Sequence, residues 1–199
     1  MKIDIILAGV GGQGILSIAA TIGMAALKDD LFMKQAEVHG MSQRGGAVQS
    51  HMRISDKEIA SDLIPMGSAD LILSVEPMES LRYLPFLSKS GWVVTNTNPY
   101  INISNYPDME KIMAEIKKQK RYITVDADAI ANDLGSKKSS NIVMLGAASP
   151  FIDLPFENFE YGIQFIFGRK GEEIVNANLK ALRAGREFAE KHKHLTNKQ

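Results

Sequence analysis

The sequence has 199 residues, with 23 Lys and Arg balanced by 23 Asp and Glu, and it contains no cysteine. The missing thiols exclude a disulfide framework, a cysteine-ligated iron–sulfur cluster and a cysteine nucleophile. Zero net charge argues against a nucleic-acid-binding domain, which normally carries a basic excess. With 45% hydrophobic residues, the chain has the composition of one globular domain with a substantial core.

The first 28 residues are largely apolar, yet they do not have the pattern of a membrane span. Asp4 and the glycines at 11–14 divide the apolar run into pieces shorter than the roughly 20 residues that a bilayer requires. No Ala-x-Ala cleavage pattern follows an apolar core, so we expect no signal peptide. The sequence predicts a strand over 3–8, a helix over 14–28, and a cytoplasmic protein with no membrane partner.

Residues 9–14 have the pattern Gly-x-Gly-x-x-Gly, directly after the first strand and at the start of the first helix. Glycines permit positive φ and a close approach of the backbone, and free N–H groups at a helix start can hold an anion. The pattern therefore predicts contacts with a phosphate or a cofactor. The alternative is that the glycines only let the helix pack closely on the sheet. The candidate contact residues are Gly9, Gly11, Gly12, Gln13 and Gly14.

The helix that follows is apolar on nearly all sides, because only Ser17, Thr21 and Lys28 form a thin polar stripe. A helix of this kind is covered on more than one side. In so small a domain we expect a subunit interface to supply part of that cover. The isolated chain is therefore a candidate homodimer.

The rest of the chain alternates short apolar runs with helical patterns. Strands are expected at 32–38, 47–54, 71–75, 92–95 and 122–125, and helices at 79–87, 107–118, 126–134 and 172–192, with 135–140 as a loop. The period of two in 47–54 predicts a half-exposed strand that is antiparallel or near an edge. Repeated strand–helix alternation predicts a single α/β domain over 1–199, with a mostly parallel sheet, helices on both faces and a frayed tail at 190–199.

Several predicted strands are followed by polar clusters, at 9–14, 37–46, 76–77 and 96–99. In open α/β sheets, ligands bind outside the carboxyl ends of the strands. Any strand end also needs polar turn residues, but the four clusters together favour a crevice at this edge.

The cluster at 37–46 is the least ordinary of the four. It combines a histidine, a glutamine, an arginine and three glycines between two predicted strands. An arginine beside a Gly-Gly pair can reach a phosphate or a carboxylate, with backbone N–H groups next to it. The alternative is a glycine-rich connection with a solvated arginine. The candidate contact residues are His39, Gln43, Arg44, Gly45 and Gly46.

Residues 9–15, 37–46 and the strand at 48–54 resemble the small subunit of 2-oxoacid:ferredoxin oxidoreductases, especially the beta subunit of indolepyruvate ferredoxin oxidoreductase. Weaker matches extend through 76–79, 91–96, 141–146 and 178–185, so the resemblance spans nearly the whole chain. It implies a Rossmann-like fold and a part in a thiamine-diphosphate-dependent reaction. An arylpyruvate and coenzyme A would give an acyl-CoA and carbon dioxide, with the electrons passing to ferredoxin.

The resemblance also implies a division of labour between two chains. A larger, cysteine-rich partner would carry the thiamine diphosphate, the magnesium ion and the iron–sulfur clusters, and ferredoxin would meet the complex. This chain would bind no cofactor and hold no catalytic residue alone, so we expect no turnover without the partner. The two sets of candidate residues would lie on the coenzyme A or oxoacid side of the active site.

Other chemistry-bearing residues have simpler interpretations. His39 and His51 lack the spacing of a zinc site, so no metal ligands are expected. Glu76 and Glu79 could be paired acids, although the helix dipole already explains an acid at position 79. The main alternative function is a stand-alone NAD(P)- or nucleotide-binding protein, for which Glu37 is the best-placed ribose-binding acid.

Overall fold

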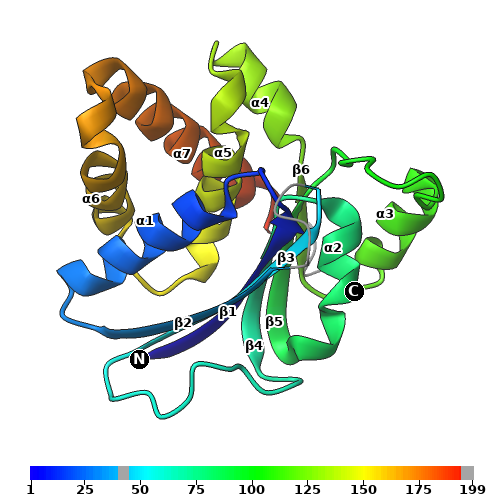
Figure 1. Ribbon diagram of the computed structural model, residues 1–199, viewed down its shortest axis with the longest axis horizontal. Helices are drawn as coiled ribbons and strands as arrows, with labels where there is room; N and C mark the ends of the chain where they lie inside the picture. The colour runs from blue at the N-terminus through cyan, green and yellow to red at the C-terminus, as the bar shows by residue number, and fades with distance from the viewer. Residues whose placement is uncertain (40–44, 194–199) are drawn as a thin grey trace.

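The apolar runs of the sequence form six strands of one sheet in the computed structural model, which describes residues 1–39 and 45–193 (Figure 1). The order of these strands is β2-β3-β1-β4-β5-β6. Their bounds are β1 (Lys2–Val10), β2 (Phe32–His39), β3 (Ala47–Ser55), β4 (Ala69–Ser74), β5 (Leu87–Asn96) and β6 (Tyr122–Val125). All six predicted strands are thus present, and β5 begins earlier than expected.

Only β3 runs against the direction of the others in the described part of the sheet. It is antiparallel to β1 and β2, whereas β1, β4, β5 and β6 form parallel pairs. The mostly parallel sheet and the antiparallel strand are both confirmed. In the register of β1 and β3, Val10 lies opposite Ala47, so the end of β1 meets the start of β3.

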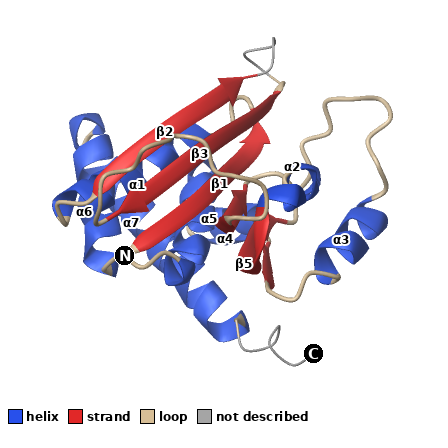
Figure 2. Ribbon diagram, turned by 90° about the horizontal axis from the view of Figure 1, so that it is seen from below, coloured by secondary structure: helices blue, strands red, loops and turns tan. Residues whose placement is uncertain are grey.

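Helices cover both faces of the sheet, as predicted, but unequally. The larger layer consists of α1 (Ile15–Lys28), α4 (Ala127–Asp133), α5 (Ser140–Ala148), α6 (Phe156–Phe167) and α7 (Glu172–His192). The smaller layer consists of α2 (Pro77–Arg82), the short helix η1 (Leu84–Phe86) and α3 (Met109–Lys117). Figure 2 shows α1, α6 and α7 behind β1, β2 and β3, with α2 and α3 apart from this layer.

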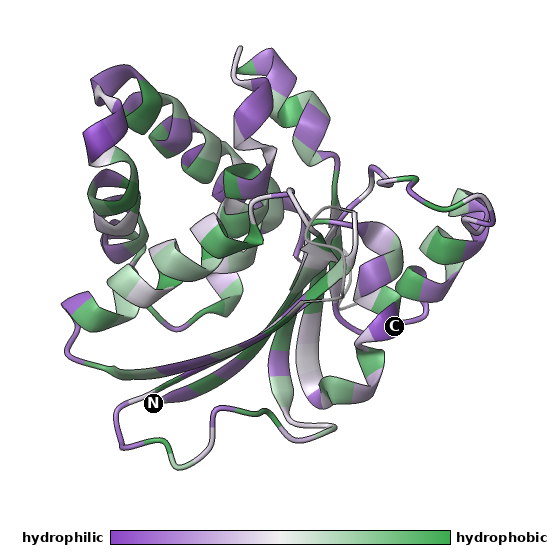
Figure 3. Cartoon of the chain, viewed as in Figure 1, coloured by the Kyte–Doolittle hydropathy of each residue, from purple (hydrophilic) through white to green (hydrophobic). Residues whose placement is uncertain are grey.

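α1 is covered by the sheet on one side and by α6 on another, and it is mostly green in the hydropathy view (Figure 3). The two helices approach closely at Gly162, where a Cβ atom would lie 2.6 Å from the carbonyl oxygen of Thr21. The cover that we expected from a subunit interface is therefore largely supplied by α6. Leu16 and Leu27 remain exposed on α1.

α5 and α7 cross with their backbones in close approach. A Cβ atom on Gly146 would lie 2.0 Å from the carbonyl oxygen of Leu182, and one on Gly185 would lie 2.0 Å from that of Val143. Only glycine fits at both positions, because the clashing atoms belong to the backbone. This crossing fixes the amino end of α5 beside the glycine turn.

The structure differs from the predicted secondary structure in three ways. The helix at 79–87 ends at Arg82, because Pro85 cannot continue an α-helix and the chain turns through η1 into β5. Two helices, α5 and α6, were not predicted at all. Residues 137–140 of the expected loop form η2 (Lys137–Ser139) and the start of α5.

β3 is not half-exposed as predicted, because the chain after it folds back over its second face. The Nδ1 atom of His51 accepts a hydrogen bond from the N–H of Ile64 at 3.0 Å, and the Arg53 guanidinium donates to the carbonyl oxygens of Ser61 and Leu63. His51 is consequently only 5% exposed. In residues 1–39 and 45–193, no helix has both the length and the apolar character needed to cross a bilayer.

Candidate functional site

The glycine turn lies at the carboxyl end of β1 and leaves the amino end of α1 open. Gly12 and Gly14 have φ values of 101° and 81°, in the region that favours glycine. No side chain caps α1, and its first turn contains no acid. The N–H groups of Ile15 and Leu16 have no hydrogen-bond acceptor among the described residues. These free donors make the turn suited to an anion.

The glycines of the turn serve different purposes. A Cβ atom on Gly9 would lie 2.4 Å from Cγ2 of Val75, so this position supports the packing alternative. A Cβ atom on Gly14 would lie 2.4 Å from Nδ2 of Asn141, which donates to the Gly14 carbonyl oxygen. Gly12 has open space around it and is exposed. Of the three, Gly12 is the one whose backbone is left free to meet a ligand.

Gln13 has its side-chain amide turned into the protein. Its Oε1 atom accepts a hydrogen bond from the N–H of Val10 at 2.7 Å, and its Nε2 atom lies 3.5 Å from the carbonyl oxygen of Val75. This side chain therefore braces the turn between β1 and β4.

The two glycine loops lie side by side, as their placement at one edge of the sheet predicted. The N–H of Gly11 donates to the Gly46 carbonyl oxygen at 2.9 Å, and the N–H of Gly45 donates to the Gly11 carbonyl oxygen at 3.4 Å. Gly45 has a φ of 78°. The side chain of His39 and the residues Gln43 and Arg44 lie outside the described part of the chain. Their contacts stay predictions.

A cleft of about 670 Å³ lies between the glycine turn, the start of α5 and the start of α7. Two lysines, Lys138 and Lys170, line it together with Ser17, and no acidic side chain does. The cleft thus combines two cations, a hydroxyl and an open helix terminus, which is the chemistry of a phosphate site. The sequence analysis missed both lysines, although the Ser- and Lys-rich stretch before α5 was a signal that could have drawn attention to Lys138.

A smaller cleft of about 240 Å³ continues from Gln13 and Asn141 towards the ends of β4 and β5. Amides and a carboxylate form its floor. The Nδ2 atom of Asn98 donates to Asp128 at 2.8 Å and to Asp126 at 2.9 Å, and Nδ2 of Asn96 donates to Asp128 at 3.2 Å. Asp126 also caps α4, because its side chain accepts a hydrogen bond from the N–H of Ala129.

Glu76 and Glu79 have separate partners in the structure. Glu79 makes an ion pair with Arg82 at 2.8 Å, which raises the pKa of the guanidinium. Glu76 caps α2 through its Oε2 atom and accepts hydrogen bonds from the Tyr100 N–H and the Tyr106 hydroxyl through Oε1. Burial and this hydrogen bond raise the pKa of Tyr106, so its hydroxyl stays a donor. Within residues 1–39 and 45–193, no group of three His, Cys, Asp or Glu could hold a metal ion.

Two solved structures share this fold. The chain aligns with a 2-oxoglutarate:ferredoxin oxidoreductase from Magnetococcus marinus at 22% identity and a TM-score of 0.75, covering 96% of this chain and 31% of that longer chain. It aligns with a keto/oxoacid ferredoxin oxidoreductase gamma subunit from Geobacter sulfurreducens at 24% identity and a TM-score of 0.70, covering 97% of this chain and 99% of the other.

Sequence relatives identify the family. The indolepyruvate oxidoreductase subunit IorB of Archaeoglobus fulgidus is 38% identical, over 93% of this chain and 94% of the relative. The IorB subunit of Methanothermobacter thermautotrophicus is 37% identical, over 93% and 96%. The family model described as pyruvate ferredoxin/flavodoxin oxidoreductase matches residues 4–188. The resemblance seen in the two glycine loops is therefore confirmed, and the chain belongs to the pyruvate ferredoxin/flavodoxin oxidoreductase family as a subunit of an oxidoreductase.

Proposed function

We propose that this chain is the small subunit of an oxidoreductase that converts arylpyruvates, including indolepyruvate, with coenzyme A into an acyl-CoA and carbon dioxide. Two electrons leave the oxoacid in this reaction and reduce ferredoxin. The observation that carries the proposal is the match to IorB subunits at 36–38% identity over 92–93% of this chain. Relatives named for 2-oxoglutarate or ketoisovalerate oxidoreductases are only 26–30% identical.

The redox groups of such a complex belong to another chain in this proposal. With no cysteine in its 199 residues, this chain offers no thiolate to an iron–sulfur cluster. The residues present therefore do not fit a resident cluster. A larger partner would hold the clusters, the thiamine diphosphate and its magnesium ion. This chain alone would not turn over the oxoacid.

In this proposal, the part of this chain in the reaction is to bind coenzyme A in the larger cleft. Coenzyme A carries several phosphate groups, which need cations and N–H donors. Lys138, Lys170 and the open amino end of α1 offer both in one place. We propose that Gly12, Gly14 and the two lysines contact the coenzyme, and that Gly45 and Gly46 keep the second loop, with His39, Gln43 and Arg44, close to it.

The test is reconstitution with the larger subunit encoded by the same source. The complex should reduce ferredoxin when it receives both indolepyruvate and coenzyme A, and either subunit alone should not. Pyruvate, 2-oxoglutarate and 2-oxoisovalerate serve as comparison substrates. Faster turnover of one of these would contradict the arylpyruvate assignment.

Calorimetry on the isolated chain separates the alternative function from this one. Tight binding of NAD(H) or NADP(H) in the absence of a partner would support a stand-alone dinucleotide-binding protein. A full chain that binds neither, yet is needed for coenzyme-dependent ferredoxin reduction, would support the proposal.

A further inference from the structure

The segment 97–108 between β5 and α3 has no regular secondary structure and exposes three apolar side chains. Tyr100, Ile101 and Ile103 are 45%, 69% and 42% exposed. A loop of this kind would normally lack a fixed position, because few apolar contacts hold it. Its two ends are nevertheless attached to one buried group.

That group is the carboxylate of Glu76, which is 0% exposed at the carboxyl end of β4. Its Oε1 atom accepts hydrogen bonds from the N–H of Tyr100, at 3.3 Å, and from the hydroxyl of Tyr106. Its Oε2 atom accepts from the N–H of Glu79 at 2.9 Å, which fixes the carboxylate on α2. Hydrogen bonds to a buried carboxylate are among the stronger ones in proteins. One side chain thus holds both ends of the loop against a rigid helix start.

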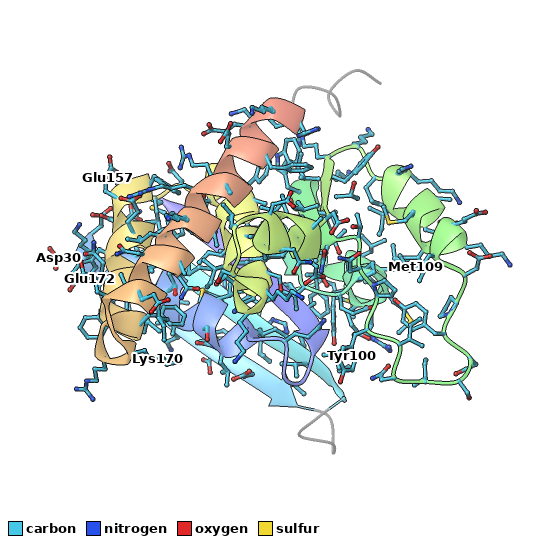
Figure 4. The ribbon with its side chains drawn as sticks, turned by 90° about the horizontal axis from the view of Figure 1, so that it is seen from above. Asp30, Tyr100, Met109, Glu157, Lys170 and Glu172 are labelled. Atoms are coloured by element: carbon cyan, nitrogen blue, oxygen red, sulfur yellow. The ribbon has the colours of Figure 1, made fainter. Side chains whose placement is uncertain are left out.

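The fixed loop forms a wall of the ligand-binding edge. Pro99 and Tyr100 line the smaller cleft together with Gln13. The Nδ2 atom of Asn102 donates to the carbonyl oxygen of Gly45, in the second glycine loop. Figure 4 shows Tyr100 near one end of the loop and Met109 at the other end, where α3 begins. The position of this loop therefore sets the width of the smaller cleft and supports the second glycine loop.

We infer that Glu76 and Tyr106 are positioning residues for coenzyme binding, which they control by holding segment 97–108 in place without touching the coenzyme. The inference rests on the proposed function, because it takes the coenzyme to occupy the larger cleft and its smaller extension. When a binding-competent conformation is only partly populated, the apparent affinity falls by that fraction. The Glu76 clamp consists of the hydrogen bonds from Tyr100 and Tyr106 to Oε1 of Glu76. Weakening this clamp should therefore raise KM for coenzyme A and leave kcat nearly unchanged.

Tyr106→Phe tests this in the reconstituted complex, since it removes one hydroxyl and keeps the ring. We expect KM for coenzyme A to rise about threefold to tenfold, with kcat changed less than twofold. Tyr161→Phe is the matched control, because that hydroxyl has no hydrogen-bond partner among the described residues and lies on α6. Glu76→Gln should give the larger rise in KM, because the amide loses one of the acceptor oxygens.

Chymotrypsin digestion of the full chain gives a readout that needs no activity. Cleavage after Tyr100 should be several-fold faster in Tyr106→Phe than in the parent or in Tyr161→Phe, because the loop opens more often. Position 106 itself precedes Pro107 and resists cleavage in all three proteins.

Lys138→Ala separates failure of the inference from failure of the proposed function. If Lys138→Ala raises KM for coenzyme A and Tyr106→Phe does not, the clamp has no role in binding and the inference is overturned. If neither variant changes KM, the coenzyme binds elsewhere, and both the inference and the proposed coenzyme site in the larger cleft are wrong. A rise in KM for coenzyme A in Tyr106→Phe alone would support the role of the Glu76 clamp and would show that Lys138 does not contact the coenzyme.

Discussion

The two faces of the sheet are held together by different forces. The layer of α1, α4, α5, α6 and α7 packs on the sheet through a continuous apolar core. On the opposite face the described residues form a smaller apolar cluster of six buried residues, and the loops over it are attached by polar side chains. These attachments are the Asp4–Arg53 pair with its bonds to Ser61 and Leu63, the bond between His51 and Ile64, and the Glu76 clamp.

This difference explains why the two sides take different parts in the site. Apolar packing is non-directional and cooperative, so it gives the glycine turn and the larger cleft a rigid base. Hydrogen bonds to loop backbones are directional and local, so each holds a segment in one place. The apolar side should therefore determine global stability, and the polar side should determine the position of individual loops.

The largest effect is expected for Phe159→Ala on the apolar side. Phe159 is 0% exposed in α6, and its truncation leaves a cavity that should lower the free energy of unfolding by about 3–5 kcal/mol. Urea denaturation measures this loss. Phe165→Ala in the same helix is the control, because its side chain is 60% exposed. Equal losses in the two variants would contradict the assignment of the core.

The polar side should show a smaller effect in Arg53→Met. The side chain of Asp4 is 0% exposed and lies 2.7 Å from the guanidinium, so the variant leaves a buried carboxylate for which Lys2 is the remaining cation among the described residues. Because Lys2 still pairs with Asp4, we expect a loss of about 1–3 kcal/mol in the free energy of unfolding, measured with urea. Arg183→Met, which breaks the exposed pair with Glu160, should cost less than about 1 kcal/mol. A loss of 4 kcal/mol or more in Arg53→Met, as large as that expected for the Phe159 cavity, would contradict the proposal that the apolar face determines global stability.

Two glycines with positive φ, one on each side, differ in the space that an added Cβ atom would have. Gly14 has φ 81° and a crowded Cβ direction, whereas Gly67 has φ 71° and nothing within 4 Å. Alanine at position 67 adds backbone strain alone, about 1 kcal/mol, and alanine at position 14 should cost about 1 kcal/mol more because it displaces Asn141. Thermal denaturation of both variants tests the difference. Gly14→Ala should also raise KM for coenzyme A in the complex, and Gly67→Ala should not.

The smallest effect is a pH dependence confined to the polar side. Burial and the nearby Arg53 lower the pKa of His51 below its usual value of 6.5. The unfolded chain therefore takes up a proton as pH falls below about 6.5 while the folded chain does not, and stability declines with falling pH in that window. The slope is at most about 1.4 kcal/mol per pH unit.

His51→Asn is the variant that isolates this effect. Its Oδ1 atom replaces the Nδ1 acceptor for the Ile64 N–H but does not titrate. Urea denaturation at pH 7.5 and pH 5.5 should show a smaller loss in the variant than in the parent. An identical loss in both proteins would show that His51 does not cause the pH dependence.

The sequence predicted the sheet well because short apolar runs bounded by turns mark strands regardless of their neighbours. It failed at α5, where Ile142–Val143–Met144–Leu145 shows no helical periodicity because every side of the helix is buried. It failed at α6 because aromatic residues have weak helix propensity and tertiary packing decides their structure. The helix α2 is shorter than the predicted range 79–87, because apolar residues continue past Pro85 although proline does not continue an α-helix there.

The candidate site was only partly predictable for a related reason. The glycine turn is a local pattern, so Gly12 and Gly14 could be found in the sequence. Lys138 and Lys170 join that turn only because α5 and α7 cross at Gly146 and Gly185, a contact between distant parts of the chain. The Glu76 clamp likewise needs β4, α2 and a loop beyond β5 to meet.

The single reversed strand in the described part of the sheet determines where the sheet tolerates change. Because β3 is antiparallel to β2, His39 lies opposite Val48, and one connection joins these neighbouring strand ends beside the carboxyl end of β1. Doubling the length of a connecting loop costs only about 0.6 kcal/mol in closure entropy, so a connection of this kind tolerates changes of length and sequence. It can therefore change while the parallel strands and their core keep their register.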